Sequence, residues 1–337
     1  MNNYENIKLD KSIYKTGSFA SQLEKLDPSK AYTGTELAGL DAFQRQLKRF
    51  DIKVSGAGSD AIEKFFATTD SAALFPEYVS RAVKQGVDDT NILSDIIASK
   101  TNINALDYRS ITTNYSDADK NIAEVGQGGA LGEIEIKLKN TLVNLKKRGR
   151  LLTASYEAVR FQRIDLFSVA LREIGLFIAK SQLKDAVNVL INGDGAPENI
   201  AEKITTAASG SVAYADLINL WSKFDEFEMN TMLVSPDMMI KLLSISELAD
   251  PATGLNFQAT GKLSTPLGAK LIKSSAVPSG TIIGLDKRFA LEMVTAGDIT
   301  VEYDKLIDCQ LERAAITSTA GFAKLYNGAV KVLQLKA

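Results

Sequence analysis

One long stretch of the sequence, residues 165–191, constrains the fold more than any other feature. It contains no proline and a single interior glycine, Gly175, so nothing in it has to break a helix. At 1.5 Å per residue, a helix of this length would be roughly 40 Å long, well above the usual length in soluble proteins. The next four residues, 192–195, read NGDG and tolerate positive φ, which predicts that the helix ends there.

The apolar residues of this predicted helix change sides near Lys180. We therefore expect its two ends to pack against different elements, so that the helix forms a spine joining two layers and is not one member of a bundle. The first apolar set is Leu166, Phe167, Ala170, Leu171, Ile174, Phe177 and Ile178, and the second is Leu183, Ala186, Val187, Leu190 and Ile191.

The absence of histidine excludes several kinds of active site. The chain of 337 residues has no His and one cysteine, Cys309, so it cannot build a His-based catalytic triad or a common Cys/His zinc site by itself. Many enzymes lack an essential histidine, so this absence narrows the possible chemistry without excluding an enzyme. Together with the lack of an active-site motif, it leads us to predict a protein that is not an enzyme and that binds no cofactor and no metal. The net charge of −2 gives no reason to expect general affinity for nucleic acid, and no apolar run is long enough to span a membrane.

The first 66 residues are predicted to form an extension with one short amphipathic helix. The helix is expected from residue 35 or 36 to Phe50, and a flexible SGAGS segment follows at 55–59. Two placements remain open, because the helix can dock on its own domain or lie as an arm on a neighbouring subunit. Beyond it, short strands and helices alternate without a regular βαβ rhythm, which indicates an α+β fold.

A protruding hairpin is predicted in the region 107–153. Ile134, Ile136 and Leu138 alternate with charged residues, as in a strand, and a strand-like run also covers 106–111. The polar, glycine-containing excursion 114–132 separates these two strands, which favours a long hairpin over a buried turn.

No motif in the chain predicts an active site. The run 126–132 has the spacing GxGGxxG, but no strand opening into a helix surrounds it, so we interpret it as a hairpin tip. Asp117, Asp119 and Glu124 are acidic enough to attract a hard cation, although they lack the ligand spacing of a known calcium motif. The hairpin and the basic run after it carry the residues that we predict to be assembly contacts, which are Asp117, Asp119, Lys120, Glu124, Lys137, Lys146, Lys147, Arg148 and Arg150.

The order of these features resembles the major capsid protein of tailed bacteriophages, which has the Hong Kong 97 fold. The resemblance extends from about residue 65 to 337. It is carried by Phe75-Pro76-Glu77, the strand pair around 112–135, the long helix ending in NGDG, TMLVSP at 231–236, PLGAKLIKSSAVP at 266–278 and TIIGLD at 281–286.

The resemblance implies a role for each segment of the chain. It implies an N-arm at 67–106, an E-loop hairpin with flanking strands at 107–153, a peripheral domain with the spine helix at 154–231, an axial domain at 232–305, and a return to the peripheral domain at 306–337.

The resemblance also implies partners and a location. We expect self-assembly into hexamers and pentamers of an icosahedral head, with scaffolding, portal and decoration proteins as further partners, weak contact with encapsidated DNA and no membrane. The expected location is the virion capsid, and the host cytoplasm during assembly. Some family members form Lys–Asn cross-links, for which Lys120 and Asn327 have the right residue types. The alternatives are an encapsulin-type nanocompartment shell, another phage structural protein such as a tail component, and a soluble enzyme with an unrecognised carboxylate site.

Overall fold

The chain divides into two compact units, each assembled from separate stretches of sequence. The computed structural model describes residues 4–9, 19–89, 92–105, 107–113, 124–128, 131, 136–249 and 265–336. Unit 1 comprises Met1–Thr90, Lys147–Ala179 and Asp298–Ser318, and unit 2 comprises Asn91–Lys146, Lys180–Gly297 and Thr319–Ala337. Both units mix helices and strands, so the predicted α+β class is confirmed.

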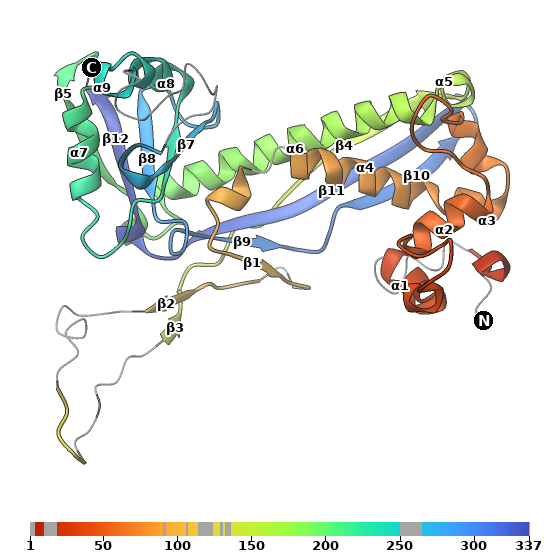
Figure 1. The fold of residues 1–337 in the computed structure, drawn as a ribbon, viewed down its shortest axis with the longest axis horizontal. Coiled ribbons are helices and arrows are strands. Elements are labelled where there is room, and N and C mark those ends of the chain that lie inside the picture. Colours follow the sequence, from red (N-terminus) through yellow and green to blue (C-terminus); the bar gives the residue numbers. More distant parts are fainter. Residues whose placement is uncertain are drawn as a thin grey trace. The chain divides into compact units, whose positions relative to one another are not determined.

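The predicted spine helix is present as α6, which spans Ile164–Asn192 and runs through both units (Figure 1). Its first half contributes Ile164, Leu171 and Ile178 to the core of unit 1. All five apolar residues predicted for its second half, from Leu183 to Ile191, are buried in the core of unit 2. The change of partners along the helix is therefore confirmed.

Three residues of the first apolar set were predicted wrongly. Leu166 is 61% exposed, Phe177 is 44% exposed, and Ala170 is exposed as well. The buried residues Ile164, Leu171 and Ile178 are seven positions apart and so follow one narrow line along the helix. Leu166, Ala170 and Phe177 lie away from that line, which explains their exposure.

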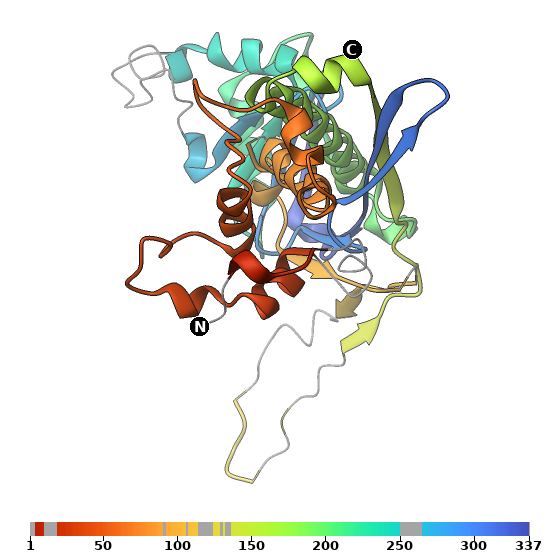
Figure 2. The same ribbon diagram turned by 90° about the vertical axis from the view of Figure 1, so that its right-hand side faces the viewer.

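The N-terminal segment of unit 1 packs on its own chain, which is the first of the two placements that the sequence left open. Phe43 and Leu47 belong to the same buried cluster as Phe75 and Val79. Figure 2 shows the backbone of this segment in red to orange. The elements involved are η1 (Tyr4–Asn6), α1 (Phe19–Leu26), η3 (Ser29–Tyr32), α2 (Ala42–Arg49), η4 (Ile62–Phe66), α3 (Thr69–Ala72) and α4 (Phe75–Asp89).

Helix α2 begins later than the pattern predicted. Asp41 forms a capping box with Gln44, in which each side chain accepts a hydrogen bond from the other residue's backbone N–H. This reciprocal pair satisfies the free backbone donors of the first turn and fixes the helix start at Ala42.

Helices α4 and α6 approach each other closely inside unit 1. A Cβ atom at Gly86 would lie 2.1 Å from the backbone oxygen of Arg172, and one at Gly175 would lie 2.1 Å from the backbone oxygen of Val83. Only glycine allows this separation.

Unit 1 also holds α5 (Tyr156–Phe161) and β10 (Thr300–Leu306), together with most of β4 (Lys146–Ser155) and of β11 (Leu311–Lys324).

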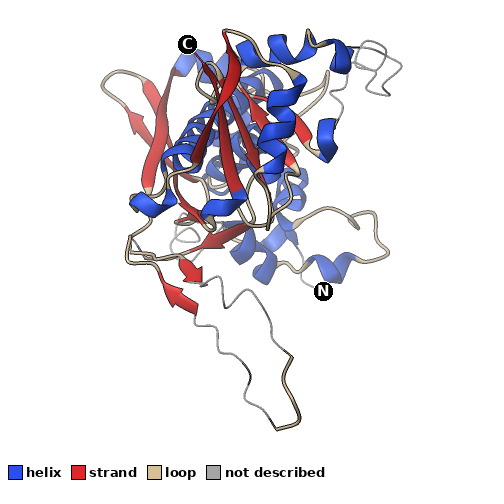
Figure 3. Cartoon of the chain, turned by 90° about the vertical axis from the view of Figure 1, so that its left-hand side faces the viewer, coloured by secondary structure: helices blue, strands red, loops and turns tan. Residues whose placement is uncertain are grey.

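Unit 2 is built on a five-stranded sheet in the order β5-β12-β8-β6-β7, seen with its helices in Figure 3. Its central strands, β6 and β8, are buried at every position. The strands are β5 (Glu202–Ser209), β12 (Val330–Lys336), β8 (Thr281–Leu285), β6 (Thr231–Val234) and β7 (Lys270–Lys273), and the helices are α7 (Tyr214–Ser222), α8 (Pro236–Leu243) and α9 (Ser246–Ala249). The short helices η5 (Leu93–Asp95), η6 (Pro197–Asn199), η8 (Pro266–Gly268) and η9 (Asn327–Ala329) connect these elements.

A second group of strands in unit 2 contains β9 (Leu291–Thr295). On one side β9 pairs in parallel with β1 (Ser99–Asn102), and on the other it pairs in antiparallel fashion with the last residues of β11. Among the described residues, no helix combines the length and the apolar character that crossing a membrane requires.

The five-stranded sheet contains strands from three of the segments that the resemblance distinguishes. Strand β5 lies within the segment 154–231 and strand β12 within 306–337, whereas β7 and β8 lie within 232–305. Hydrogen bonding places β12 between β5 and β8. The sheet therefore combines strands from both sides of the boundaries at 231/232 and 305/306.

Candidate assembly surfaces

The predicted hairpin is present, and it carries an exposed apolar face. Strand β2 (Ile111–Thr113) pairs in antiparallel fashion with β3 (Ile136–Leu138), and Ile111 is the partner of Leu138. Ile111, Ile136 and Leu138 are 50%, 66% and 64% exposed, and they share one face because side chains alternate along a strand. Lys137 is exposed on the opposite face. A two-stranded hairpin of this kind is marginally stable in water unless its apolar face is covered.

The strand that leads into the hairpin is tied to β9 by one buried carboxylate, Glu292. Its Oε1 accepts hydrogen bonds from the hydroxyls of Thr101 at 2.6 Å and Tyr108 at 2.7 Å, and its Oε2 accepts one from the Ser110 hydroxyl. Glu292 is almost fully buried. Three hydroxyl donors replace the water that this carboxylate would have in the unfolded chain.

The strand that leaves the hairpin is held by a second buried charge, Lys139. Its Nζ donates to Oδ2 of Asp194 at 2.9 Å and to the backbone oxygen of Lys324. Asp194 lies in the NGDG turn after α6, and its Oδ1 accepts a hydrogen bond from Nδ2 of Asn199 at 2.6 Å. The exit strand is thereby joined to the end of the spine helix.

A second lysine, Lys324 at the end of β11, lies fully buried beside this ion pair. Its Nζ donates to the backbone oxygens of Asn199 at 3.0 Å and Leu190 at 3.3 Å, and to Oδ1 of Asn327 at 2.6 Å. Burial lowers the pKa of Lys324 to about 7, against the attraction of Asp194. Burial also raises the pKa of Asp194, but hydrogen bonds from Asn199 and Lys139 hold it below its ordinary value.

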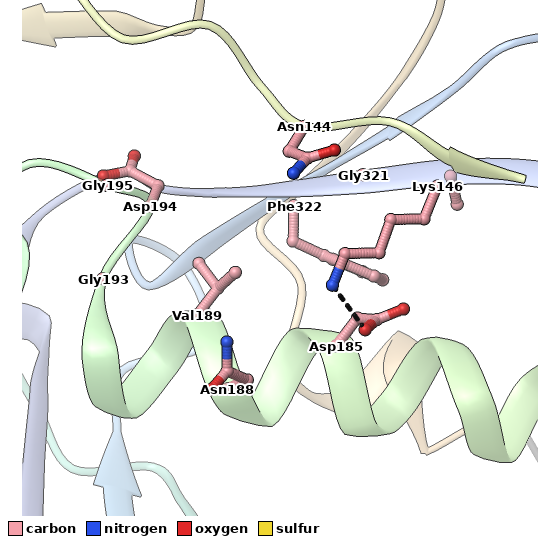
Figure 4. A pocket seen from close by; sticks show the side chains of 11 residues that line it. Asn144, Lys146, Asp185, Asn188, Val189, Gly193, Asp194, Gly195, Gly321 and Phe322 are labelled. Atoms are coloured by element: carbon pink, nitrogen blue, oxygen red, sulfur yellow. Dashed lines mark hydrogen bonds and ion pairs between the residues drawn. The ribbon is translucent and has the colours of Figure 1, made fainter.

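The predicted basic run lies on β4, and its first lysine is paired. Nζ of Lys146 donates to Oδ1 of Asp185 at 2.9 Å (Figure 4). This pair crosses an open pocket of about 220 Å³ in unit 2, lined by Asn144, Lys146, Asp185, Asn188, Val189, Gly193, Asp194, Gly195, Ala320, Gly321 and Phe322. Lys147 and Arg150 are exposed and Arg148 is half-buried, all three in unit 1.

The structure describes only part of the predicted acidic excursion. Asp117, Asp119 and Lys120 lie outside the described residues, as do Gly129, Ala130 and Gly132 of the GxGGxxG run. Glu124 is exposed. Within the described part of the chain, no three His, Cys, Asp or Glu residues are grouped closely enough to hold a metal ion.

The sequence did not point to the buried polar groups at the hairpin base. Lysine and glutamate are ordinarily exposed, and the partners of Lys139, Lys324 and Glu292 come from distant stretches of chain. The one available signal was the NGDG motif, which contains Asp194 but was interpreted only as a helix stop.

Solved structures with the same arrangement of elements identify the fold. The capsid of a native GTA particle matches with a TM-score of 0.52 and 14% identity, over 77% of this chain and 91% of that chain. Gordonia phage Cozz matches with a TM-score of 0.50 and 14% identity, over 85% and 98%. Mycobacterium phage Che8 matches with a TM-score of 0.50 and 15% identity, over 68% and 84%. The chain therefore has the Hong Kong 97 fold of phage capsids.

The sequence itself gives the family. Residues 139–308, half of the chain, match the family model described as phage capsid protein. The chain belongs to this family, as the resemblance noted from its sequence implied. No curated protein matches the sequence.

Proposed function

We propose that this chain is a major capsid protein that assembles with copies of itself, as hexamers and pentamers, into the icosahedral head enclosing the double-stranded DNA of a tailed phage. The observation that carries the proposal is the family match over residues 139–308 on a chain with the capsid fold. The proposed role is structural, without an active site. The virion capsid is the proposed location, and the host cytoplasm is the place of assembly.

The contact proposed for the hairpin is with a second copy of the chain. Its apolar face, formed by Ile111, Ile136 and Leu138, has no cover within the described residues. Transferring one such side chain from water into an interface contributes about 1–2 kcal/mol, and this gain recurs at every equivalent contact of a shell.

The charged residues of the hairpin and of β4 remain proposed assembly contacts. Arg148 and Arg150 lie on one side of β4 and Lys147 on the other, because side chains alternate along a strand. Such a strand can form ion pairs with a neighbouring copy or touch DNA phosphates. Scaffolding, portal and decoration proteins are further proposed partners.

The segment roles are proposed in the same way. The N-arm is assigned to 67–106, the E-loop to 107–153, the peripheral domain to 154–231 and 306–337, and the axial domain to 232–305. Because β5 and β12 share a sheet with β6–β8, these names describe stretches of chain and do not describe separate folding units.

Electron microscopy of the full chain, expressed alone and purified by size exclusion, tests the proposed function. Closed particles of tens of nanometres are expected. Particles that package DNA when phage partners are supplied would be a phage head, whereas particles filled with an enzyme would be a nanocompartment. A monodisperse monomer or dimer that stays unassembled after a scaffolding partner is added would overturn the proposal.

A matched pair of variants tests the hairpin contact. Leu138→Ser removes an exposed apolar side chain, whereas Asn140→Ser, two residues further on, removes an exposed polar one of similar size. We expect Leu138→Ser to lower the particle yield about tenfold, since 1.4 kcal/mol corresponds to a factor of ten in an equilibrium constant. Equal yields from the two variants would exclude this contact.

A further inference from the structure

The base of the hairpin contains buried charged side chains in addition to its backbone pairing. Two short backbone hydrogen bonds already join the entry and exit strands, from Lys139 N to Ser110 O at 2.8 Å and from Val143 N to Tyr108 O at 2.9 Å. Beyond these, the entry strand contacts Glu292 and the exit strand contacts Asp194, both through buried side chains. Buried charges are costly unless they are fully paired, so this arrangement calls for an explanation beyond strand pairing.

Each of the two carboxylates lies on a firmly held part of unit 2. Glu292 lies within β9, which is hydrogen-bonded on one side to β1 and on the other to β11. Asp194 follows the last turn of α6, where Asn199 fixes its second oxygen. A hydrogen bond to either carboxylate therefore attaches the hairpin to a firmly held element of its own unit.

The two contacts act on different strands of the hairpin. Tyr108 and Ser110 precede β2, whereas Lys139 follows β3. With one anchor alone, the other strand would be held only by its backbone contacts. Two anchors on opposite strands fix the direction in which the hairpin leaves the unit.

The exit strand is held at a third point, by close backbone packing. A Cβ atom at Gly321 of β11 would lie 2.7 Å from the backbone oxygen of Asn144 and 3.0 Å from side-chain atoms of Val143 and Leu145. The segment 143–145 thus packs directly on β11 where only glycine fits. This contact limits how far the exit strand can shift if an anchor is lost.

We propose that Glu292 and Asp194 are positioning residues for assembly, which hold the two strands of the hairpin so that the hairpin points toward its docking surface before a second copy arrives. This inference rests on the proposed function, because it concerns the same hairpin contact. Ordering a segment before binding avoids the entropic cost of ordering it during binding. Buried, hydrogen-bonded charges suit this task because their interactions depend strongly on direction and distance.

Two sets of variants distinguish the loss of an anchor from a general loss of stability. They remove different hydroxyls that donate to the same carboxylate, Glu292. Tyr108→Phe/Ser110→Ala deletes the two hydroxyls by which the entry strand contacts Glu292. Thr101→Val deletes the third hydroxyl on the same carboxylate, but Thr101 lies on β1, which stays paired with β9 through its backbone. Both variants leave Glu292 under-satisfied, and only the first frees the entry strand of the hairpin from this carboxylate.

The experiment measures the hairpin's direction in the unassembled full chain. In a Cys309→Ser background, spin labels at Lys137→Cys on β3 and Lys203→Cys on β5 report a distance distribution by pulsed electron paramagnetic resonance. We expect Tyr108→Phe/Ser110→Ala to widen the distribution at least twofold and, in the unlabelled chain with Lys137 intact, to lower the particle yield about tenfold. Thr101→Val should leave both at the parent value.

A second variant keeps the test decisive if the first does not fold. Lys139→Met removes the exit-strand anchor while keeping the length of the side chain, and it should widen the distribution in the same way. An unchanged distribution in the folded anchor variants, or equal widening in Thr101→Val, would overturn the inference. Absence of particles from the parent chain would count against the proposed function alone, because the distance measurement needs no assembly.

Discussion

Replacing Gly175 by alanine is expected to destabilise unit 1, although alanine is the better helix former. Gly175 lies in the first half of α6, where the helix crosses α4. An added Cβ would lie 2.1 Å from the backbone oxygen of Val83 and 2.9 Å from the backbone nitrogen of Val87. Both neighbours are backbone atoms, so no flexible side chain can move aside.

The magnitude follows from two opposing terms. Alanine in place of glycine inside a helix stabilises by about 0.5–1 kcal/mol. Ordinary contact begins near 3.4 Å, so the two helices would have to separate by more than an ångström. Overpacking of this kind costs about 1–3 kcal/mol, and the upper part of that range applies where backbone must move. We therefore expect a net loss of about 1–2 kcal/mol in the free energy of unfolding.

Urea denaturation followed by circular dichroism measures this loss. Gly86→Ala, on the facing side of the crossing, should give a similar loss, because its Cβ would lie 2.1 Å from the backbone oxygen of Arg172. Gly58→Ala is the control, since its Cβ would meet no atom within 4 Å. If Gly175→Ala instead raised stability by up to 1 kcal/mol, as at an exposed helical site, the close crossing would be refuted.

Three further predictions concern stability. Arg45→Met should cost about 3–5 kcal/mol in urea denaturation, because it leaves the buried Asp27 carboxylate, 2.5 Å from Nε of Arg45, without its cation; a loss below 1 kcal/mol would contradict this. Stability should rise by up to about 1.4 kcal/mol per pH unit from pH 7 to the ordinary lysine pKa of 10.5, because Lys324 with its pKa lowered to about 7 binds fewer protons in the folded chain than in the unfolded chain. Lys324→Met should flatten that rise, and an identical slope in both proteins would refute the assignment. Deleting residues 1–66 should leave little soluble protein after expression, since this segment supplies part of the unit 1 core; a folded, soluble product would show the core to be complete without it.

The sequence predicted best where a local pattern was sufficient. The spine helix was expected at 165–191 and spans Ile164–Asn192, because an uninterrupted helical stretch and the NGDG stop define both ends. The hairpin was also predictable, since alternation near Ile136 needs no distant partner. Strand β5 was missed because only Ile204 and Thr206 in it are buried, and its pairing depends on β12, more than a hundred residues later.

The buried polar groups at the hairpin base were beyond the reach of sequence patterns. The alternation that predicted a strand places Lys137 and Lys139 on the same polar face, so it predicts the same exposure for both. In the structure, Lys137 is exposed and Lys139 is buried. Their difference arises only from Asp194 and Lys324, which the tertiary fold brings to Lys139. Burial of a lysine is decided by such distant partners, and a single sequence does not reveal them.

The positions of the two C-terminal strands have a consequence for synthesis. Strand β12 lies between β5 and β8, and β11 has strand neighbours on both sides, so the inner places of both sheets are filled by strands that are synthesised after their neighbours. A nascent chain thus leaves the ribosome with strand edges open in both sheets until β11 and β12 have been made. Truncated chains would lack a central strand and would fold into neither unit. Interrupted translation products would therefore be poor competitors for places in a growing shell.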